Sequence, residues 1–215
     1  MRILVTGSSS GIGKAIAQKF LSEGHSVVGI DKLPATIKRK NYTHIVADVF
    51  YDKLPEIEGV EVLVNNAGVQ NSGNDIDVNL KGTIAVTETY AIQPAIKSVV
   101  FVASASAETG SEFPEYVASK GGMVSYMKNV ALRIAKYGAT SNSLSPGGVL
   151  TPLNQHIIDD PELWRQVMDE TPLRKWATAE EIAEFAYFVA VINKSMTAQN
   201  ILIDNGEAAK ANFIW

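Results

Sequence analysis

The chain has 215 residues, of which 46% are hydrophobic and 20% charged, and 19 Lys and Arg against 23 Asp and Glu give it a formal net charge of -4. These proportions predict a globular protein with a sizeable core, and the acidic balance argues against a nucleic-acid partner. The sequence contains no cysteine and no His-based metal motif, so we expect no metal site. We find no leader segment and no apolar run near the roughly 20 residues of a membrane helix, so we expect a cytoplasmic protein without a membrane partner.

Short β-branched segments alternate with longer stretches of helical periodicity along the chain. The predicted strands cover residues 2–6, 26–30, 43–47, 60–64, 98–103 and 200–203. Such alternation is typical of a parallel sheet with crossover helices. No repeat or linker divides the chain, so the predicted fold class is α/β, a Rossmann-type doubly wound parallel sheet in a single domain spanning residues 1–215.

A glycine-rich turn directly follows the first predicted strand. Residues 6–13 read Thr-Gly-Ser-Ser-Ser-Gly-Ile-Gly, and the helical period that begins there ends at Gly24. Glycines let the backbone approach a pyrophosphate, and the N–H groups and dipole at a helix start stabilise its charge. An ordinary tight turn is the alternative, but the strand before it and the helix after it are the context that a dinucleotide site requires.

The second predicted strand leads into Asp31, 20 residues after Gly11. A carboxylate at this place accepts hydrogen bonds from an adenosine ribose, and it repels a 2'-phosphate by several kcal/mol, roughly 4 at 4 Å and an effective dielectric of 20. Lys32 offsets part of that repulsion, but Ser10 supplies no second cation. NAD is therefore favoured over NADP; a carboxylate of a plain strand-end turn is the alternative.

Tyr116 and Lys120 are four residues apart in a stretch of helical periodicity, so they share one face of a helix. A phenol with a pKa near 10 is a weak acid and base at neutral pH, but an adjacent cation stabilises its phenolate. Such a pair is common on solvated helices, so its meaning depends on the motifs around it.

Those motifs occur in the order and context of a known family. They are the glycine-rich turn, Asn65-Asn66-Ala67-Gly68 after a strand, Asn79, Ser104 at a strand end, Pro146-Gly147-Gly148-Val149-Leu150-Thr151, and Ile201-Leu202-Ile203-Asp204-Asn205-Gly206. Over nearly its whole length the chain resembles the short-chain dehydrogenase/reductase family. Residues 171–176 resemble members known as 3-oxoacyl-carrier-protein reductases.

The resemblance implies an acid/base mechanism in which Tyr116 protonates a carbonyl oxygen as hydride arrives from the nicotinamide, or deprotonates an alcohol in reverse. Lys120 would assist Tyr116 and bind the nicotinamide ribose, and Ser104 would donate a hydrogen bond to the substrate oxygen. Asn79 would hold a water in the proton relay. The loop to Tyr116 is about one residue short, which leaves Ser106 as the alternative to Ser104.

The resemblance also implies a set of cofactor contacts, which includes the adenine contacts Asp48 and Val49. The full set is Gly7, Ser9, Ser10, Gly11, Ile12, Gly13, Asp31, Asp48, Val49, Asn66, Ala67, Gly68, Tyr116, Lys120, Pro146, Gly147, Val149 and Thr151. The implied partner is a small alcohol or carbonyl compound, either a 3-oxoacyl thioester or a sugar or polyol. An NAD-binding sensor or scaffold without turnover is the alternative function, although it would not need the acid/base set.

The chain departs from the family in several intervals that are shorter than usual. They are residues 31–48, 48–65 and 68–79. With Pro34 and Pro55, these lengths predict shortened crossover helices and an exposed adenine side, and the polar composition of residues 70–75 permits a disordered segment. Residues 139–144 are more polar than a buried central strand should be.

Residues 151–176 correspond to the family's substrate lid. Within the lid, His156 is expected at the surface, and the spacing of Trp164 and Met168 favours helix packing over a pocket. His25 and His44 flank strands and are expected to be solvated. The residues just before Tyr116, Glu112 to Pro114, are candidate substrate contacts.

The helix predicted over residues 116–137 is more apolar than one buried face requires. With the family resemblance, this predicts a homodimer or homotetramer built on that helix and on the one after Asn79. The apolar tail, residues 212–215, is expected to pack on a neighbouring subunit or on its own core.

Overall fold

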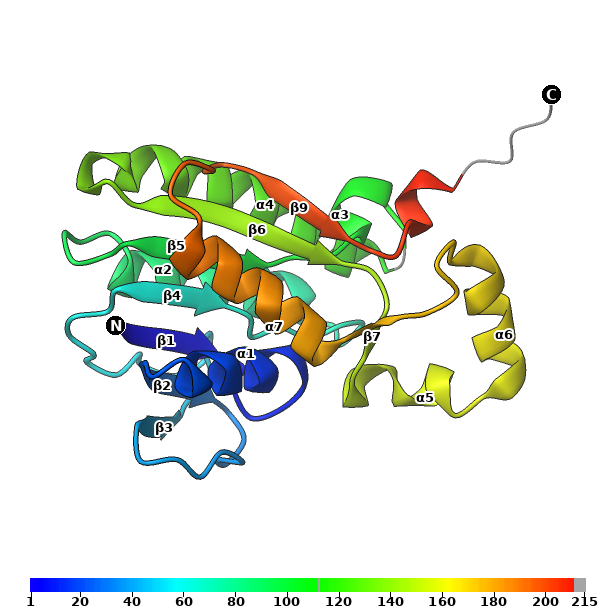
Figure 1. The fold of residues 1–215 in the computed structure, drawn as a ribbon, viewed down its shortest axis with the longest axis horizontal. Coiled ribbons are helices and arrows are strands. Elements are labelled where there is room, and N and C mark those ends of the chain that lie inside the picture. Colours follow the sequence, from blue (N-terminus) through cyan, green and yellow to red (C-terminus); the bar gives the residue numbers. More distant parts are fainter. Residues whose placement is uncertain (112, 211–215) are drawn as a thin grey trace.

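A seven-stranded parallel sheet forms the centre of the molecule in the computed structural model, which describes residues 1–111 and 113–210 (Figure 1). Its strand order is β3-β2-β1-β4-β5-β6-β9. The strands are β1 (Arg2–Thr6), β2 (Ser26–Asp31), β3 (Tyr42–Val46), β4 (Val62–Asn65), β5 (Ser98–Val102), β6 (Thr140–Pro146) and β9 (Asn200–Ile203). The order reverses between β1 and β4, which is the topological switch point where such sheets bind ligands. The predicted doubly wound Rossmann-type fold is confirmed.

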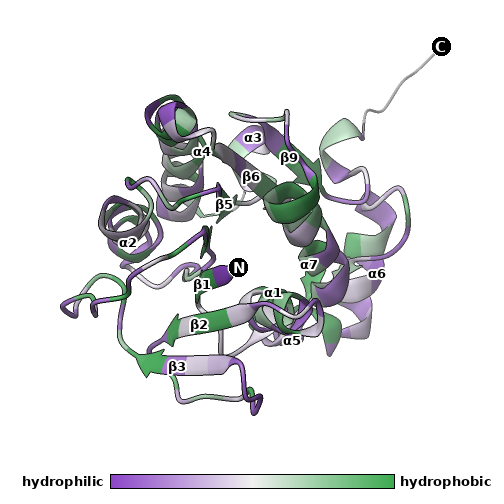
Figure 2. Cartoon of the chain, turned by 60° about the vertical axis from the view of Figure 1, so that its left-hand side comes forward, coloured by the Kyte–Doolittle hydropathy of each residue, from purple (hydrophilic) through white to green (hydrophobic). Residues whose placement is uncertain are grey.

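Helices cover both faces of this sheet, as Figure 2 shows. On one face, α1 (Gly11–Ser22) and α7 (Ala179–Tyr187) pack in a core that includes Phe20 and Ile182. On the other face, α2 (Thr83–Tyr90) and α4 (Pro114–Ile134) pack in a second core that includes Phe101 and Met127. All four of these side chains are fully buried. Because helices cover both faces of the sheet, its strands are apolar on both faces.

Shorter elements complete the chain. They are the π-helical segments η1 (Ile76–Gly82) and η4 (Phe188–Ile192), the short helices α3 (Ser106–Thr109), η2 (Ala135–Tyr137), η3 (Pro152–Asn154), α5 (Gln155–Ile158) and η5 (Glu207–Ala209), the helix α6 (Pro161–Glu170), and the paired strands β7 (Val149–Leu150) and β8 (Ala177–Thr178). The helices α5 and α6 stand beyond the end of the sheet in Figure 1. The segment that carries them leaves the main body after β7 and returns at β8.

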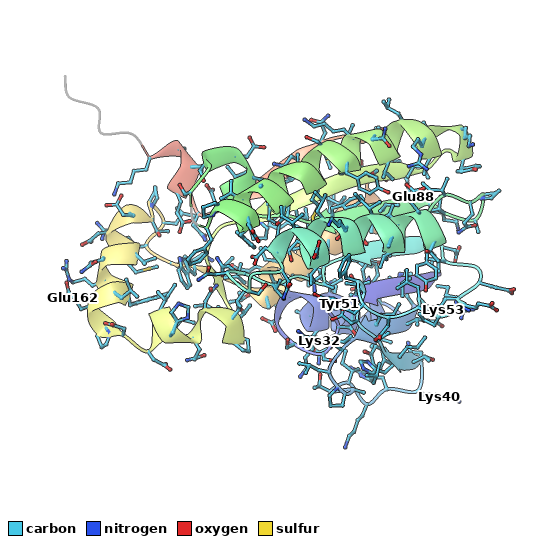
Figure 3. All side chains as sticks on the ribbon, turned by 180° about the vertical axis from the view of Figure 1, so that it is seen from behind. Lys32, Lys40, Tyr51, Lys53, Glu88 and Glu162 are labelled. Atoms are coloured by element: carbon cyan, nitrogen blue, oxygen red, sulfur yellow. The ribbon has the colours of Figure 1, made fainter. Side chains whose placement is uncertain are left out.

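The predicted shortening of crossover helices is confirmed in residues 32–41 and 47–61. Neither connection contains a helix; extended chain replaces it, and Ile37, Val49 and Val60 fill the space beside the sheet with buried side chains. Figure 3 shows Lys32, Lys40 and Lys53 of these connections pointing outward. The sheet therefore keeps a covered face with fewer residues than a full helix would need.

Residues 70–75 form a defined turn where the polar composition permitted disorder. The carboxylate of Asp75 is 1% exposed and accepts hydrogen bonds from the Asn71 and Ser72 N–H groups, each at 2.8 Å. Asn71 and Gly73 adopt positive φ values of 51° and 77°, which suits Asn and Gly. One buried carboxylate organises a segment whose composition alone reads as a loose loop.

The polar strand β6 is buried because each of its polar side chains is paired. The amide of Asn142 donates to one carbonyl and accepts one N–H from residues 196–199, at 2.9 and 3.1 Å. The hydroxyls of Ser143 and Ser145 both donate to Oδ1 of Asn200 on β9, at 2.6 and 2.7 Å. Burial of polar groups is tolerated when their hydrogen bonds are satisfied, so β6 occupies a central position despite its sequence.

The longest described helix, α4, has 21 residues and carries several charged side chains along its length. Neither α4 nor another helix within residues 1–111 and 113–210 is both long and apolar enough to cross a membrane. Two sequence predictions, the contact of Glu112 and the packing of the tail at residues 212–215, lie outside the described residues.

Candidate active site

Two adjoining cavities open at the carboxyl ends of the strands. The first, of about 290 Å³, runs along the glycine-rich turn and Asp31. The second, of about 990 Å³, lies between the sheet and the α5–α6 segment. Tyr116 and Thr151 line both cavities, so the predicted acid/base residue lies where the two meet.

The turn before α1 is held in shape by close backbone packing. Gly7 has a φ of +68°, and a Cβ on Gly13 would lie 2.1 Å from the Gly7 carbonyl oxygen, so a larger residue at position 13 would not fit. The side-chain amide of Asn66 donates to the carbonyls of Thr6 and Gly7 at 3.0 and 3.1 Å. Ser10, at the start of α1, makes no side-chain cap, which keeps the helix N-terminus accessible to an anion.

Asp31 lies at the end of β2 and lines the first cavity while only 9% exposed. Its two carboxylate oxygens accept the N–H groups of Ser9 and Leu33, at 2.8 and 2.9 Å. Asp31, which the sequence predicts as a ribose contact, therefore also fixes the backbone of the glycine-rich turn at Ser9 and of its own loop at Leu33. Each oxygen retains a further lone pair for a ligand hydroxyl.

The predicted cofactor residues divide into three groups by position. Those that line the first cavity are Gly7, Ser10, Gly11, Ile12, Asp31, Asp48, Val49, Asn66, Ala67, Gly68, Tyr116, Lys120 and Thr151. Pro146, Gly147 and Val149 line the second cavity instead. Ser9 and Gly13 line neither cavity, because Ser9 turns its N–H to Asp31 and Gly13 packs beneath the turn.

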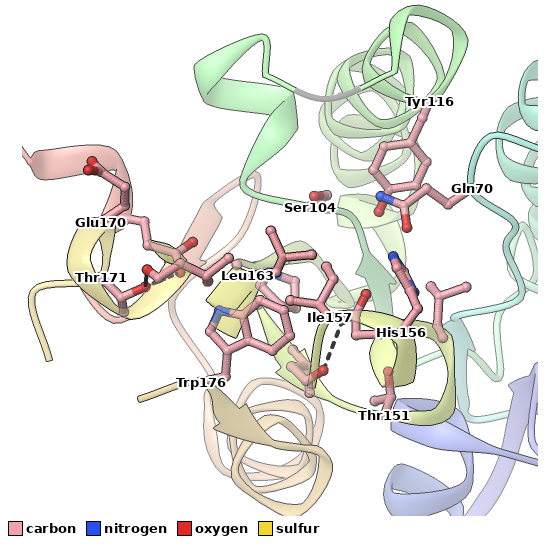
Figure 4. Close-up of a pocket in the computed structure, with 18 of the residues that line it drawn as sticks. Gln70, Ser104, Tyr116, Thr151, His156, Ile157, Leu163, Glu170, Thr171 and Trp176 are labelled. Atoms are coloured by element: carbon pink, nitrogen blue, oxygen red, sulfur yellow. Dashed lines mark hydrogen bonds between the residues drawn. The ribbon is translucent and has the colours of Figure 1, made fainter. Parts of the chain in front are cut away.

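The acid/base candidates converge from β5 and α4. The Nζ of Lys120 lies 5.6 Å from the centre of the Tyr116 ring and donates to the Val102 carbonyl at 3.0 Å. Lys120 is 5% exposed, so its ammonium acts at short range with little screening. Figure 4 shows Ser104 and Tyr116 facing the same cavity.

Asn79 lies in the π-helical segment η1 and is fully buried. Its amide accepts the Val69 N–H at 2.7 Å and donates to the Val69 carbonyl at 2.8 Å and to Ser119 at 3.0 Å. Both amide donors are therefore used within the protein. Its side chain fixes the loop after β4 against α4, and its Oδ1 keeps one lone pair, so the role in holding a relay water stays a prediction.

His44 and His25 are less solvated than the sequence suggested. Nδ1 of His44 bonds the Tyr42 hydroxyl at 2.9 Å and Nε2 bonds the Leu33 carbonyl at 2.9 Å, and Tyr42 in turn bonds Ser8 of the nucleotide turn at 2.9 Å. Desolvation raises the pKa of Tyr42, which keeps this phenol neutral. Burial lowers the pKa of His25. This series of hydrogen bonds from Ser8 to the Leu33 carbonyl supports the glycine-rich turn. Its members are scattered in the sequence, so no motif indicated it.

The second cavity contains polar side chains that the sequence analysis did not single out. Gln70, labelled in Figure 4, and Glu207 from η5 both line this cavity. His156 is exposed, as predicted, and also lines this cavity. Trp164 packs edge-on against Trp176 with ring centres 5.1 Å apart, which matches its predicted packing role.

Glu207 carries a prediction about stability. Burial raises its pKa above the ordinary 4.5, and hydrogen bonds from Thr171, Trp176 and the Gly148 N–H only partly oppose this. The ionised carboxylate is thus less favourable in the folded than in the unfolded state, a penalty present above the folded pKa and lost as pH falls below it. Glu207→Gln is expected to raise the melting temperature at pH 7.5 by about 1 or 2 °C, and to leave it nearly unchanged near pH 4.

Glu181→Gln is the matched control, measured by the same thermal unfolding at both pH values. Hydrogen bonds from Lys175 and the Thr178 N–H lower the pKa of Glu181, so its ionised form is favoured in the folded state. This variant should lose stability at pH 7.5 and approach the parent protein as pH falls. A Glu207→Gln protein that is less stable than the parent at pH 7.5 would contradict the burial argument.

Comparison with known proteins gives a consistent result. A family model described as enoyl-(acyl carrier protein) reductase matches residues 43–207. The chain is 29% identical to glucose 1-dehydrogenase of Gluconobacter oxydans, over 99% of this chain and 93% of that protein, and 27% identical to 3-oxoacyl-[acyl-carrier-protein] reductase of Buchnera aphidicola, over 94% of each. The structure of Thermoplasma acidophilum aldohexose dehydrogenase is similar, with a TM-score of 0.85, 25% identity, and coverage of 100% of this chain and 96% of that one.

The Rossmann-like sheet, its glycine-rich turn and these relatives define an oxidoreductase of the nicotinamide-dependent class. The chain belongs to the short-chain dehydrogenase/reductase family. The resemblance on which the sequence analysis relied is confirmed at the level of the family.

Proposed function

We propose that the protein is an NAD(H)-dependent oxidoreductase that interconverts an alcohol and the corresponding carbonyl compound. The observation that carries this proposal is the place of Tyr116, which lines both the nucleotide cavity and the larger second cavity and has Lys120 beside it. A sensor or scaffold would need the first cavity alone. The large second cavity next to an acid/base pair therefore favours turnover.

The residues of the first cavity fit a dinucleotide. The accessible start of α1 suits a pyrophosphate, and Asp31 suits a ribose diol while repelling a 2'-phosphate, which is why we assign NAD. Lys32 also lines this cavity, next in sequence to that carboxylate, and offsets part of its charge. When bound there, the nicotinamide supplies or accepts the hydride.

In the proposed mechanism Tyr116 donates a proton to the carbonyl oxygen during reduction and removes the hydroxyl proton during oxidation. Lys120 favours the phenolate by charge, and the Val102 carbonyl holds its ammonium in place. The Ser104 hydroxyl donates a hydrogen bond to the substrate oxygen as negative charge develops there. Asn79 acts as a positioning residue that fixes the loop after β4 against α4.

The substrate classes under consideration are sugars or polyols and 3-oxoacyl thioesters, which are the substrates that the relatives' names suggest. A phosphorylated or carrier-bound substrate calls for cations at the cavity. Among the described lining residues of the second cavity, Lys210 is the only Lys or Arg, and its ammonium bonds Glu170 at 2.8 Å. The lining therefore favours an uncharged, hydroxyl-bearing substrate.

We also propose that residues 151–176 form a lid over the second cavity. These residues supply one wall of it, and the two-stranded pair β7–β8 brackets the segment at both ends. Such an arrangement anchors the ends while the wall between them moves as a unit.

The test is an assay of NAD reduction and NADH oxidation by the purified protein. The panel contains hexoses, polyols, simple secondary alcohols and ketones, and 3-oxoacyl thioesters. Turnover of at least one alcohol–carbonyl pair is the expected result. Tight NAD binding without turnover of any compound on this panel would instead favour the sensor.

Ser104 and Ser106 give a prediction that separates the two candidate hydroxyls. Ser104 lines the second cavity, whereas Ser106 is 3% exposed and lies at the start of α3, outside the lining. Ser104→Ala is expected to lower kcat about 10²- to 10³-fold, the usual cost of removing one transition-state donor. Ser106→Ala should stay within about threefold, and steady-state kinetics that reverse this order would reassign the role.

We propose that the protein forms a homo-oligomer through α4 and the helix after Asn79. An exposed apolar side chain, Leu132 at 78% exposure, lies on α4 in keeping with this prediction. A monomeric mass in light scattering at micromolar concentration would exclude it.

A further inference from the structure

A half-buried carboxylate stands in the second cavity without a part in the proposed acid/base chemistry. Glu207 begins the short helix η5, directly after the closing strand β9 and its turn. Its Oε1 accepts the Thr171 hydroxyl at 2.9 Å, and the Gly148 N–H donates to the same carboxylate. These bonds fix its position but do not neutralise its charge.

The indole of Trp176 lies beside this carboxylate. Trp176 is 7% exposed, lines the cavity, and its Nε1–H is buried without a hydrogen-bond partner of full geometry among the described residues. It nonetheless faces Glu207 closely enough to stabilise the ionised form. The indole N–H has less than 1 Å² of accessible area, so it helps to position the Glu207 carboxylate, and the carboxylate is the group that a ligand meets in the cavity.

Two glycines make room for this pair. A Cβ on Gly148 would lie 1.9 Å from Nε1 of Trp176, and a Cβ on Gly147 would lie 2.7 Å from Oε2 of Glu207. The Pro-Gly-Gly turn after β6 therefore lets the indole and the carboxylate approach the backbone. The subsite is a consequence of the same turn that leads into the lid.

The chemistry of this carboxylate selects among ligand groups. An ionised carboxylate accepts hydrogen bonds and donates none, so a substrate hydroxyl satisfies it by donating to Glu207. A carboxylate or phosphate is repelled by Glu207 across a poorly screened distance.

We propose that Glu207, positioned by Thr171 and Trp176, forms a distal hydroxyl-binding subsite that makes the enzyme specific for neutral polyhydroxy substrates over acids of the same length. The proposal rests on the proposed function, because the subsite lies in the cavity that Tyr116 and Ser104 face. It adds a specificity determinant that neither the glycine-rich turn nor the Tyr–Lys pair indicates.

The test compares D-glucitol with D-gluconate, which have equal chain length and differ in one terminal group. The parent protein should oxidise glucitol with a kcat/KM at least 10-fold above that for gluconate. Glu207→Gln keeps the side-chain shape and the bond to Thr171 but removes the charge, so the ratio should fall about 10-fold, largely through KM. A role in structure alone would lower both values together and leave the ratio unchanged.

Glu162→Gln is the matched control, because Figure 3 shows Glu162 on the outer side of α6 and its carboxylate pairs with Arg165. Its glucitol-to-gluconate ratio should equal that of the parent protein. An unchanged ratio in Glu207→Gln, or a parent protein that prefers gluconate, would overturn the subsite.

Two further measurements separate this proposal from the proposed function. Cyclohexanol, which has no second hydroxyl, tests turnover by the parent protein alone, and its oxidation without any discrimination between glucitol and gluconate would refute only the subsite. Calorimetric titration of glucitol into the parent and Glu207→Gln proteins tests the subsite without turnover. Tighter binding by the parent is expected, and equal affinity would overturn the subsite.

Discussion

Replacing Tyr116 by Phe is expected to lower kcat about 10²- to 10⁴-fold while the affinity for NADH stays within about twofold. The substitution removes the one hydroxyl proposed to exchange a proton with the substrate oxygen, and general acid–base catalysis contributes effects of this size. The ring remains in place between the two cavities. Turnover with the best substrate of the panel measures the first effect, and quenching or enhancement of NADH fluorescence measures the second.

Tyr126→Phe on the same helix is the control for losing a phenol from α4. The Tyr126 hydroxyl donates to Glu88 at 2.7 Å, far from either cavity lining. This variant should retain kcat within about twofold. A Tyr116→Phe protein that keeps more than a tenth of the parent kcat would assign the proton transfer to another group.

Asp31→Asn should raise the ratio of NADP to NAD efficiency about 10²-fold. Two unit charges 4 Å apart repel by roughly 4 kcal/mol at an effective dielectric of 20, and screening at the open cavity removes part of that, so about 3 kcal/mol remains. Lys32 beside the cavity would then act on a 2'-phosphate without an opposing carboxylate. Initial rates with each cofactor at fixed substrate give the ratio.

The same variant should also lose about 1 to 3 kcal/mol of unfolding free energy. Asp31 accepts the N–H groups of both Ser9 and Leu33, and an amide offers only one oxygen for these two donors.

Asp48→Asn is the control for cofactor choice, because the Asp48 carboxylate lines the same cavity and accepts the Phe50 N–H in a similar way. It should change the use of both cofactors alike, and an unaltered NADP-to-NAD ratio in Asp31→Asn would show that charge at the ribose does not decide the choice.

The sheet and the outline of the site were predictable because their signals are local. Each strand of the main sheet except β6 was expected from a short β-branched segment, with its start or end shifted by at most two residues. Tyr116 and Lys120 are related by helical spacing, and the glycine-rich turn by its flanking strand and helix. Chain order and periodicity are enough to place such features.

The remainder depended on contacts between distant parts of the chain. The ordered turn at residues 70–75 rests on one buried carboxylate, and the tolerance of β6 for polar side chains rests on partners near residue 200. Glu207 lies 91 residues after Tyr116, and its presence in the same cavity follows from the sheet order and not from any motif. Asn79 was found from its motif, but the hydrogen bonds of its amide to Val69 and Ser119 required coordinates.

The pairing of β6 with β9 determines when this protein can complete its fold. Asn142, Ser143 and Ser145 obtain their hydrogen bonds from residues 196–200, which follow them in the chain by 54 to 57 residues. Until those residues are synthesised, burying β6 beside β5 would leave several polar groups unpaired, at about 1 to 3 kcal/mol each. Strands β1 to β5 are free of this dependence and can associate earlier, whereas the side of the sheet that carries the Pro-Gly-Gly turn and the substrate cavity is assembled only after residues 196–200 have been synthesised.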